Sequence, residues 1–199
     1  MSTKHFFHIV GLYLDKLEQA FRLDPSALAN LYHEKAAAAI KNGNYNTAIE
    51  QCQKSLELDA NDVEAHFQLG VAYMGNRKTE EAIAALKKVI ELDPNRASVH
   101  YRLGVLFDKE GALDSAISSF SRAIELDPKR ADYHYALGIA QDKNNMQDQA
   151  IGTLEKAIEL APDVDKYHYR LGLIFDGRGE HEKAIEAFKK ASEAEGAAG

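Results

Sequence analysis

The stretch SVHYRLGVLFDKEGALDSAISSFSRAIELDP, residues 98–128, determines the fold class. Apolar residues recur at helical spacing over residues 98–110, which predicts a helix there. Gly111 permits a left-handed helix ending, and a second apolar face over residues 114–126 predicts another helix. Pro128 stops this second helix, because proline disfavours helical geometry in the residue before it. The stretch therefore predicts two helices joined by a tight turn.

The same pattern returns every 34 residues along the chain. Three sets of residues show this spacing: His66, His100, His134 and His168; Gly70, Gly104, Gly138 and Gly172; and Ala48, Ala82, Ala116, Ala150 and Ala184. Glycine and alanine at these positions allow the two helices to cross closely. A helix pair of this size cannot bury its apolar face alone, so a fixed period of this length predicts an all-α stack of repeated units.

The period divides the sequence into five units and a front segment. The units are residues 29–62, 63–96, 97–130, 131–164 and 165–198, and residues 1–28 precede them. In the front segment, residues 20–25 (AFRLDP) match residues 123–128 (AIELDP). Residues 10–23 are therefore interpreted as the second helix of a preceding unit that lacks its first helix, followed by a linker.

Composition excludes several classes of protein. With 45% hydrophobic and 28% charged residues, the chain resembles an ordinary soluble folded protein. The net charge of -7 does not favour a nucleic-acid-binding surface. A single cysteine, Cys52, cannot form an internal disulfide, and no apolar run approaches the ~18 residues of a membrane span. We expect a cytoplasmic protein that does not insert into membranes.

The repeated unit resembles the tetratricopeptide repeat. The residues that carry the resemblance are leucine–glycine in the first helix, an aromatic three residues after the glycine (Tyr73, Phe107, Phe175), alanine in the second helix, and a closing proline. Histidine stands in place of the usual tryptophan in four units, and Ala60 replaces the proline of the first. The resemblance implies a right-handed α-solenoid that binds other proteins and carries no catalytic site.

Neither metal binding nor catalysis is favoured by the candidate residues. The periodic histidines lie on different units, separated by about one helix diameter or more, ~8–10 Å, so they cannot easily share one ion. We interpret them as packed rings. Cys52 lies on the apolar face of a second helix, where a small hydrophobic side chain is usual. No phosphate loop, nucleophile elbow or metalloprotease motif occurs, so we expect no cofactor, no metal and no catalytic residue.

The resemblance places the partner-binding residues on a concave face built from the first helices. It implies an aromatic row (Phe67, Tyr101, Tyr135, Tyr169) beside an aliphatic row (Val71, Val105, Ile139, Leu173). Six positive side chains (Arg102, Arg170, Lys41, Lys109, Lys143, Lys166) and six negative ones (Glu34, Glu64, Asp108, Asp132, Asp142, Asp176) flank these rows. Tyrosine combines a large apolar ring with a hydroxyl group, which suits a binding surface. The alternative is that these tyrosines pack against neighbouring repeats.

The front segment is a second candidate site, for self-association. Five apolar residues near its start have no first helix to cover them: Phe6, Phe7, Ile9, Val10 and Leu12. Exposing such side chains forfeits ~1.5–3 kcal/mol each relative to burial. The alternatives are that the segment folds back or frays, or that it docks in the groove of another copy, which would build a homo-oligomer.

The first unit also resembles that of the magnetosome-associated members of the family, in Tyr32, Lys35, Lys41, Gly43, Tyr45 and Ala48. This resemblance implies a self-assembling coat that is peripheral on the vesicle membrane and recruits other proteins. Two alternatives stay open at this point. One is a monomeric peptide-binding co-chaperone or assembly factor, and the other is a regulatory domain of a larger protein.

Overall fold

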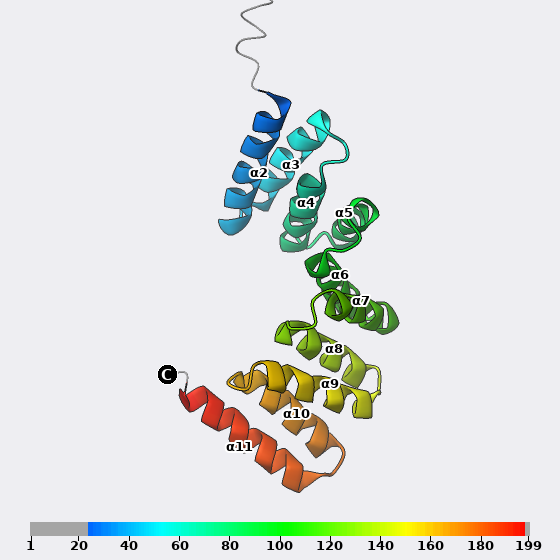
Figure 1. The fold of residues 1–199 in the computed structure, drawn as a ribbon, viewed down its shortest axis with the longest axis vertical. Helices are drawn as coiled ribbons and strands as arrows, with labels where there is room; N and C mark the ends of the chain where they lie inside the picture. The colour runs from blue at the N-terminus through cyan, green and yellow to red at the C-terminus, as the bar shows by residue number, and fades with distance from the viewer. Residues whose placement is uncertain (1–23, 198–199) are drawn as a thin grey trace, which may run out of the picture. The chain divides into compact units, whose positions relative to one another are not determined.

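The computed structural model describes residues 24–197, which form ten α-helices in that range. In chain order they are α2 (Pro25–Lys41), α3 (Tyr45–Leu58), α4 (Val63–Gly75), α5 (Thr79–Leu92), α6 (Ala97–Lys109), α7 (Leu113–Leu126), α8 (Ala131–Lys143), α9 (Gln147–Leu160), α10 (Asp165–Gly177) and α11 (His181–Ala197). The described residues contain no strand. The all-α prediction is confirmed, and both helices predicted within residues 98–126 begin and end within one residue of α6 and α7 (Figure 1).

The chain separates into two compact units, residues 1–88 and 89–199, so the boundary falls within α5. In the first unit α2 packs against α3, and α4 contacts both. In the second unit α6, α8 and α10 pair with α7, α9 and α11 respectively, and each later first helix also contacts the preceding pair. Each unit is therefore a stack of helix pairs, as the period predicts.

The first helix of the first pair begins earlier than the period suggests. α2 begins at Pro25, so residues 25–28, which we interpreted as linker, form its first turn. Proline suits this place because its missing N–H would be unpaired there in any case. The proposed half-repeat over residues 10–23 lies outside the described residues, as do Phe6, Phe7, Ile9, Val10 and Leu12.

In each helix pair, one residue of the turn between the two helices adopts the left-handed backbone conformation, always at the same place in the repeat. Gly43, Gly111 and Gly179 have φ of 74–75°, and Arg77 and Asn145 occupy the same place in the other two pairs with φ of 59° and 60°. Glycine adopts this conformation at no steric cost, and asparagine tolerates it better than most residues. The expected left-handed ending at Gly111 is confirmed.

Close helix crossings explain the repeated glycine of the first helices. A Cβ atom added to Gly104 would lie 2.6 Å from the ring of Phe120, and one added to Gly138 would lie 2.8 Å from Leu154 Cγ. Both distances are too short for real contacts, so only glycine lets the paired helices approach this closely. Ala116 and Ala150, on the second helices, are fully buried. No helix in residues 24–197 is long and apolar enough to cross a membrane.

Candidate partner-binding surface

The predicted groove residues lie on first helices, as expected. Phe67 and Val71 lie on α4 in the first unit, where both are half-buried. The others lie on α6, α8 and α10 in the second unit: Tyr101, Arg102, Val105, Lys109, Tyr135, Ile139, Lys143, Tyr169, Arg170 and Leu173. The second unit therefore holds most of the candidate surface.

Tyrosines from successive first helices stack on one another in the second unit. The rings of Tyr101 and Tyr133 have centroids 4.9 Å apart, and those of Tyr135 and Tyr167 are 4.8 Å apart. Tyr133 and Tyr167 are only 3% and 4% exposed. They were absent from the predicted groove, although their 34-residue spacing, two residues before Tyr135 and Tyr169, was a signal for them. Two row tyrosines, Tyr101 and Tyr135, thus also hold neighbouring repeats together.

The freely exposed part of the surface lies at the last pair of helices. Tyr169 is 54% exposed and Leu173 is 40% exposed, whereas Tyr101, Tyr135, Val105 and Ile139 are half-buried. Tyr169 and Leu173 are four residues apart on α10 and so lie on the same side of that helix. A partner side chain can therefore contact these two residues without displacing a neighbouring helix.

The charged groups of the surface largely pair with one another. Lys143 Nζ lies 2.7 Å from an oxygen of Asp108, which joins α8 to α6. Arg170 Nη2 lies 2.7 Å from an oxygen of Asp142, which joins α10 to α8. Because these ion pairs neutralise charges within the surface, the side chains that remain to bind a partner are chiefly aromatic and aliphatic.

Burial also affects the titration of the stacked rings. It raises the pKa of Tyr101, Tyr133, Tyr135 and Tyr167, whose hydroxyl groups are already protonated at neutral pH. Lys166 Nζ lies over two of these rings, 5.4 Å from the centroid of Tyr135 and 5.5 Å from that of Tyr167. These contacts are within cation–π range. The surface thus offers neutral hydroxyl donors and one cation held over the rings.

Comparison with known families decides what kind of protein this is. A family model described as tetratricopeptide repeat matches residues 67–131 and 135–198, and a second model described as TPR repeat matches residues 37–76. The chain belongs to the tetratricopeptide repeat family. A search of curated proteins gives no match.

Solved structures of tetratricopeptide repeat proteins resemble this chain over most of its length. A crystal structure of MamA is 34% identical, with a TM-score of 0.77, and the match covers 80% of this chain and 94% of MamA. MamA of Desulfovibrio magneticus RS-1, residues 41 to the end, is 27% identical with a TM-score of 0.81, over 85% and 96% of the two chains. The tetratricopeptide repeat protein YrrB, described as having an unusual peptide-binding site, is 22% identical with a TM-score of 0.75, over 90% and 91%, and shows the fold alone. The sequence of the first repeat, residues 29–62, indicated a resemblance to MamA, and that resemblance is therefore confirmed.

The repeated histidines of these tetratricopeptide repeats have a structural role. Nε2 of His66, His100 and His134 lies 3.0 Å from the carbonyl oxygen of the residue six positions earlier, and Nε2 of His168 lies 2.8 Å from that of Pro162. Each histidine thus fastens its first helix to the loop that precedes it. No group of metal-ligating side chains occurs in the described part of the chain. The interpretation as packed rings is supported, and the hydrogen bond explains why the ring is a histidine.

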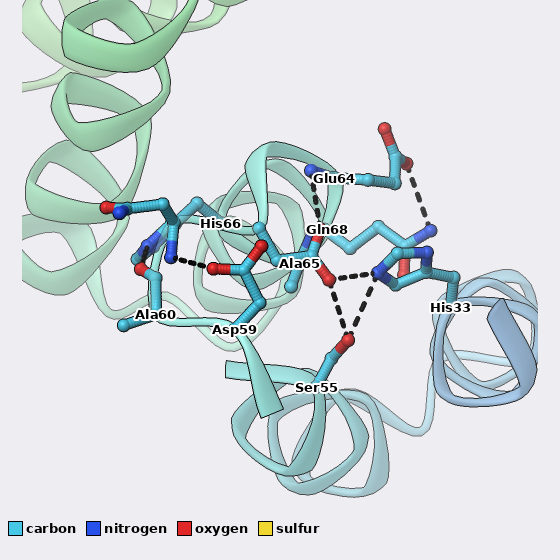
Figure 2. Close-up of polar contacts among 10 residues, drawn as sticks. His33, Ser55, Asp59, Ala60, Glu64, Ala65, His66 and Gln68 are labelled. Atoms are coloured by element: carbon cyan, nitrogen blue, oxygen red, sulfur yellow. Dashed lines mark hydrogen bonds and ion pairs between the residues drawn. The ribbon is translucent and has the colours of Figure 1, made fainter. Parts of the chain in front are cut away.

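A serine, a histidine and an aspartate meet in the first tetratricopeptide repeat, where Figure 2 shows Ser55 and His33 joined by a dashed line. Asp62 Oδ2 lies 2.6 Å from His33 Nε2 and accepts a hydrogen bond of 2.7 Å from Ser55 Oγ. A catalytic triad uses one histidine nitrogen for the serine and the other for the aspartate. Here Nε2 of His33 contacts both residues, and Ser55 is fully buried. The geometry therefore does not support nucleophilic catalysis.

The same aspartate caps α4. Asp62 Oδ1 accepts hydrogen bonds from the backbone N–H groups of Glu64 and Ala65, at 3.1 and 3.0 Å. Burial raises the pKa of Asp62, but the hydrogen bonds from Ala65, Ser55 and His33 outweigh it and leave that pKa below its usual value. Arg96, Arg130 and Val164 hold the equivalent place in later repeats and form no side-chain cap. The cluster is thus a brace for the loop in which Ala60 replaces proline.

Cys52 is also structural in this tetratricopeptide repeat protein. Its side chain is 1% exposed on the apolar face of α3, as predicted. Burial, with the charges of Asp62 and Glu64, raises the pKa of the Cys52 thiol to about 12. A thiol in this environment is a poor nucleophile, because the thiolate is the reactive form.

Proposed function

We propose that this protein is a non-catalytic scaffold that binds segments of partner proteins on the aromatic and aliphatic surface of its second unit. The surface comprises Tyr101, Val105, Tyr135, Ile139, Tyr169 and Leu173. The observation that carries the proposal is the exposure of Tyr169 and Leu173, which present adjacent apolar area on α10. Large aromatic side chains of this kind dominate the energetics of protein–protein interfaces.

The scaffold also associates with copies of itself, and it acts in the cytoplasm as a peripheral coat on magnetosome vesicles. The resemblance to MamA along most of the chain supports the vesicle assignment. The apolar residues Phe6, Phe7, Ile9, Val10 and Leu12 form the segment that self-associates in this proposal. In this proposal, attachment to the vesicle runs through a protein partner.

A quantitative capture experiment tests the binding surface. The double variant Ile139→Ser and Leu173→Ser changes the ninth residue of two first helices, and neither side chain is fully buried. Full-length protein is immobilised, and the captured proteins of the source cell are identified and quantified by mass spectrometry. We expect the double variant to lose about tenfold or more of the capture of specific partners while its helical circular dichroism stays unchanged.

A matched control uses Leu58→Ser, which removes a 42% exposed leucine from the first unit. This control is expected to capture partners as the wild type does. Equal capture by the double variant and the wild type would contradict the assignment of the surface.

A further inference from the structure

Among residues 24–197, one face of the last helix pair lacks the cover that its equivalents have. In α6 and α7, Tyr101 and Ile117 pack against a cluster that includes Leu137 and Ala140 of the next first helix, α8. In α8 and α9, Tyr135 and Ile151 pack against a cluster that includes Leu171 and Ile174 of α10. The equivalents in α10 and α11 are Tyr169 and Ile185, which are 54% and 68% exposed. We call Tyr169, Ile185 and Phe188 the end face.

The end face has the same arrangement of aromatic side chains as the surface of α6 and α7 against which the next first helix, α8, packs. The ring of Tyr169 lies 5.5 Å from that of Phe188, and the ring of Tyr101 lies 5.7 Å from that of Phe120. In the pair of α6 and α7, Tyr133 of the next first helix, α8, stacks against Tyr101, with ring centroids 4.9 Å apart. An occupant of the end face therefore needs a helix with an aromatic residue at the place of Tyr133.

The chain contains one further segment with this pattern. Residues 6–16, FFHIVGLYLDK, align with the first-helix sequences VHYRLGVLFDK (99–109), YHYALGIAQDK (133–143) and YHYRLGLIFDG (167–177). The alignment places Phe6 at the position of Tyr133, Gly11 at that of Gly138, and Lys16 at that of Lys143. This alignment assigns residues 10–16 to a first helix, so it replaces the interpretation of residues 10–23 as a second helix.

Charge also complements the end face in this alignment. Lys143 of one first helix pairs with Asp108 of the preceding one, at 2.7 Å. The residue equivalent to Asp108 on α10 is Asp176, a 59% exposed carboxylate that already contacts His181. Lys16 lies at the position of Lys143, so the segment brings a lysine to the place where Asp176 can receive it.

We propose that residues 6–16 of one copy of the chain seat as a first helix on the end face of a second copy, with Phe6 against Tyr169 and Lys16 beside Asp176. This inference rests on the self-association included in the proposed function, and it names the site that receives the segment. Such a contact joins two different surfaces, so it builds open chains or rings instead of closed two-fold dimers.

Light scattering of the full-length protein over a range of concentrations tests the contact. We expect the mass of the wild type to rise in steps with concentration, and Ile185→Glu and Phe6→Asp each to weaken association by about tenfold or more. Ile185 is mostly exposed, so Ile185→Glu leaves the fold intact. The control Leu58→Glu, at an exposed leucine outside the end face, is expected to leave association unchanged.

Charge reversal tests the register. Lys16→Asp and Asp176→Lys are each expected to weaken association, and the chain that carries both substitutions is expected to recover it. A short bismaleimide should also join a chain carrying Lys16→Cys to a separate chain carrying Asp176→Cys, with the buried Cys52 silent.

Four results would overturn this contact: a monomeric wild type at every concentration, equal weakening by Leu58→Glu, no recovery in the double charge reversal, or no cross-link between the chain carrying Lys16→Cys and the chain carrying Asp176→Cys. The proposed function is tested independently of this contact. If Ile185→Glu abolishes association while partner capture still depends on Ile139 and Leu173, both proposals hold. If association behaves as expected and the capture of partners does not, only the binding surface is wrong.

Discussion

Tyr133 of α8 stacks on Tyr101 of α6, with ring centroids 4.9 Å apart and ring planes 24° apart. This contact joins one helix pair to the next in the second unit. Tyr133 is 3% exposed, so Tyr133→Ala leaves a cavity at the junction of the two pairs. We expect a loss of about 3–4 kcal/mol in the free energy of unfolding, measured by urea denaturation.

The exposed Tyr169 provides the comparison for that measurement. Tyr169→Ala removes the same kind of ring from the same repeat position as Tyr101, but the ring is 54% exposed. We expect it to cost less than about 1 kcal/mol. Similar losses for the two variants would show that stacking between repeats does not stabilise the unit.

The bond between His134 and the Pro128 carbonyl gives a second stability prediction. His134→Phe keeps an aromatic ring in the buried site but removes the hydrogen bond of 3.0 Å to the preceding loop. We expect a destabilisation of about 1 kcal/mol, measured by thermal and urea unfolding. His181→Phe, at an exposed position, is the control. An unchanged stability of His134→Phe would mean that the ring alone matters.

The Asp62 brace predicts a pH dependence. The folded state lowers the pKa of Asp62, so the stability that this carboxylate contributes is present above its unfolded pKa of about 3.9 and is lost as the pH falls below that value. At pH 7 we expect Asp62→Ala to cost about 1–2 kcal/mol through loss of the α4 cap.

Unfolding of Asp62→Ala and the wild type by urea at pH 7 and at pH 3 tests this sign. The difference between the two proteins should shrink at pH 3. Val164→Ala is the matched control, because Val164 holds the same place before α10 without capping it. A difference that stays constant with pH would contradict the role of the ionised carboxylate.

Cys52 gives a chemical prediction. Because its thiol is buried and its pKa is raised to about 12, native protein at pH 8 should react with iodoacetamide far more slowly than the unfolded chain does. Mass spectrometry of the timed reaction measures both rates. Rapid modification of the native protein would show that α3 opens readily or that the thiol is exposed.

The sequence predicted the fold closely, since the 34-residue period determines both the helix pairs and their crossing glycines. The sequence analysis did not predict the contacts between neighbouring repeats, because these depend on which side chain of one repeat faces the next. Tyr133 and Tyr167 were left out, because the family pattern points to the row that contains Tyr101 and Tyr135. The ion pair between Lys143 and Asp108 could not be predicted, because a list of charged residues does not say which of them meet across neighbouring helices.

The brace around Asp62 was missed for a related reason. Its partners Ser55 and His33 are 7 and 29 residues away in the chain and belong to one unit only, so the repeat gives no second instance of the pattern. Ala60 in place of proline was the visible signal that this loop is held differently.

Site-specific photo-crosslinking tests the central claim most directly. A benzophenone amino acid is placed at Leu173 of the full-length chain, and in a control chain at Leu58, two leucines of similar exposure in different units. After irradiation in extract of the source cell, covalent adducts are separated and identified by mass spectrometry. We predict discrete adducts with partner proteins from Leu173 and none of these from Leu58. Equal adducts from both positions, or none from Leu173, would contradict the assignment of the binding surface to the second unit.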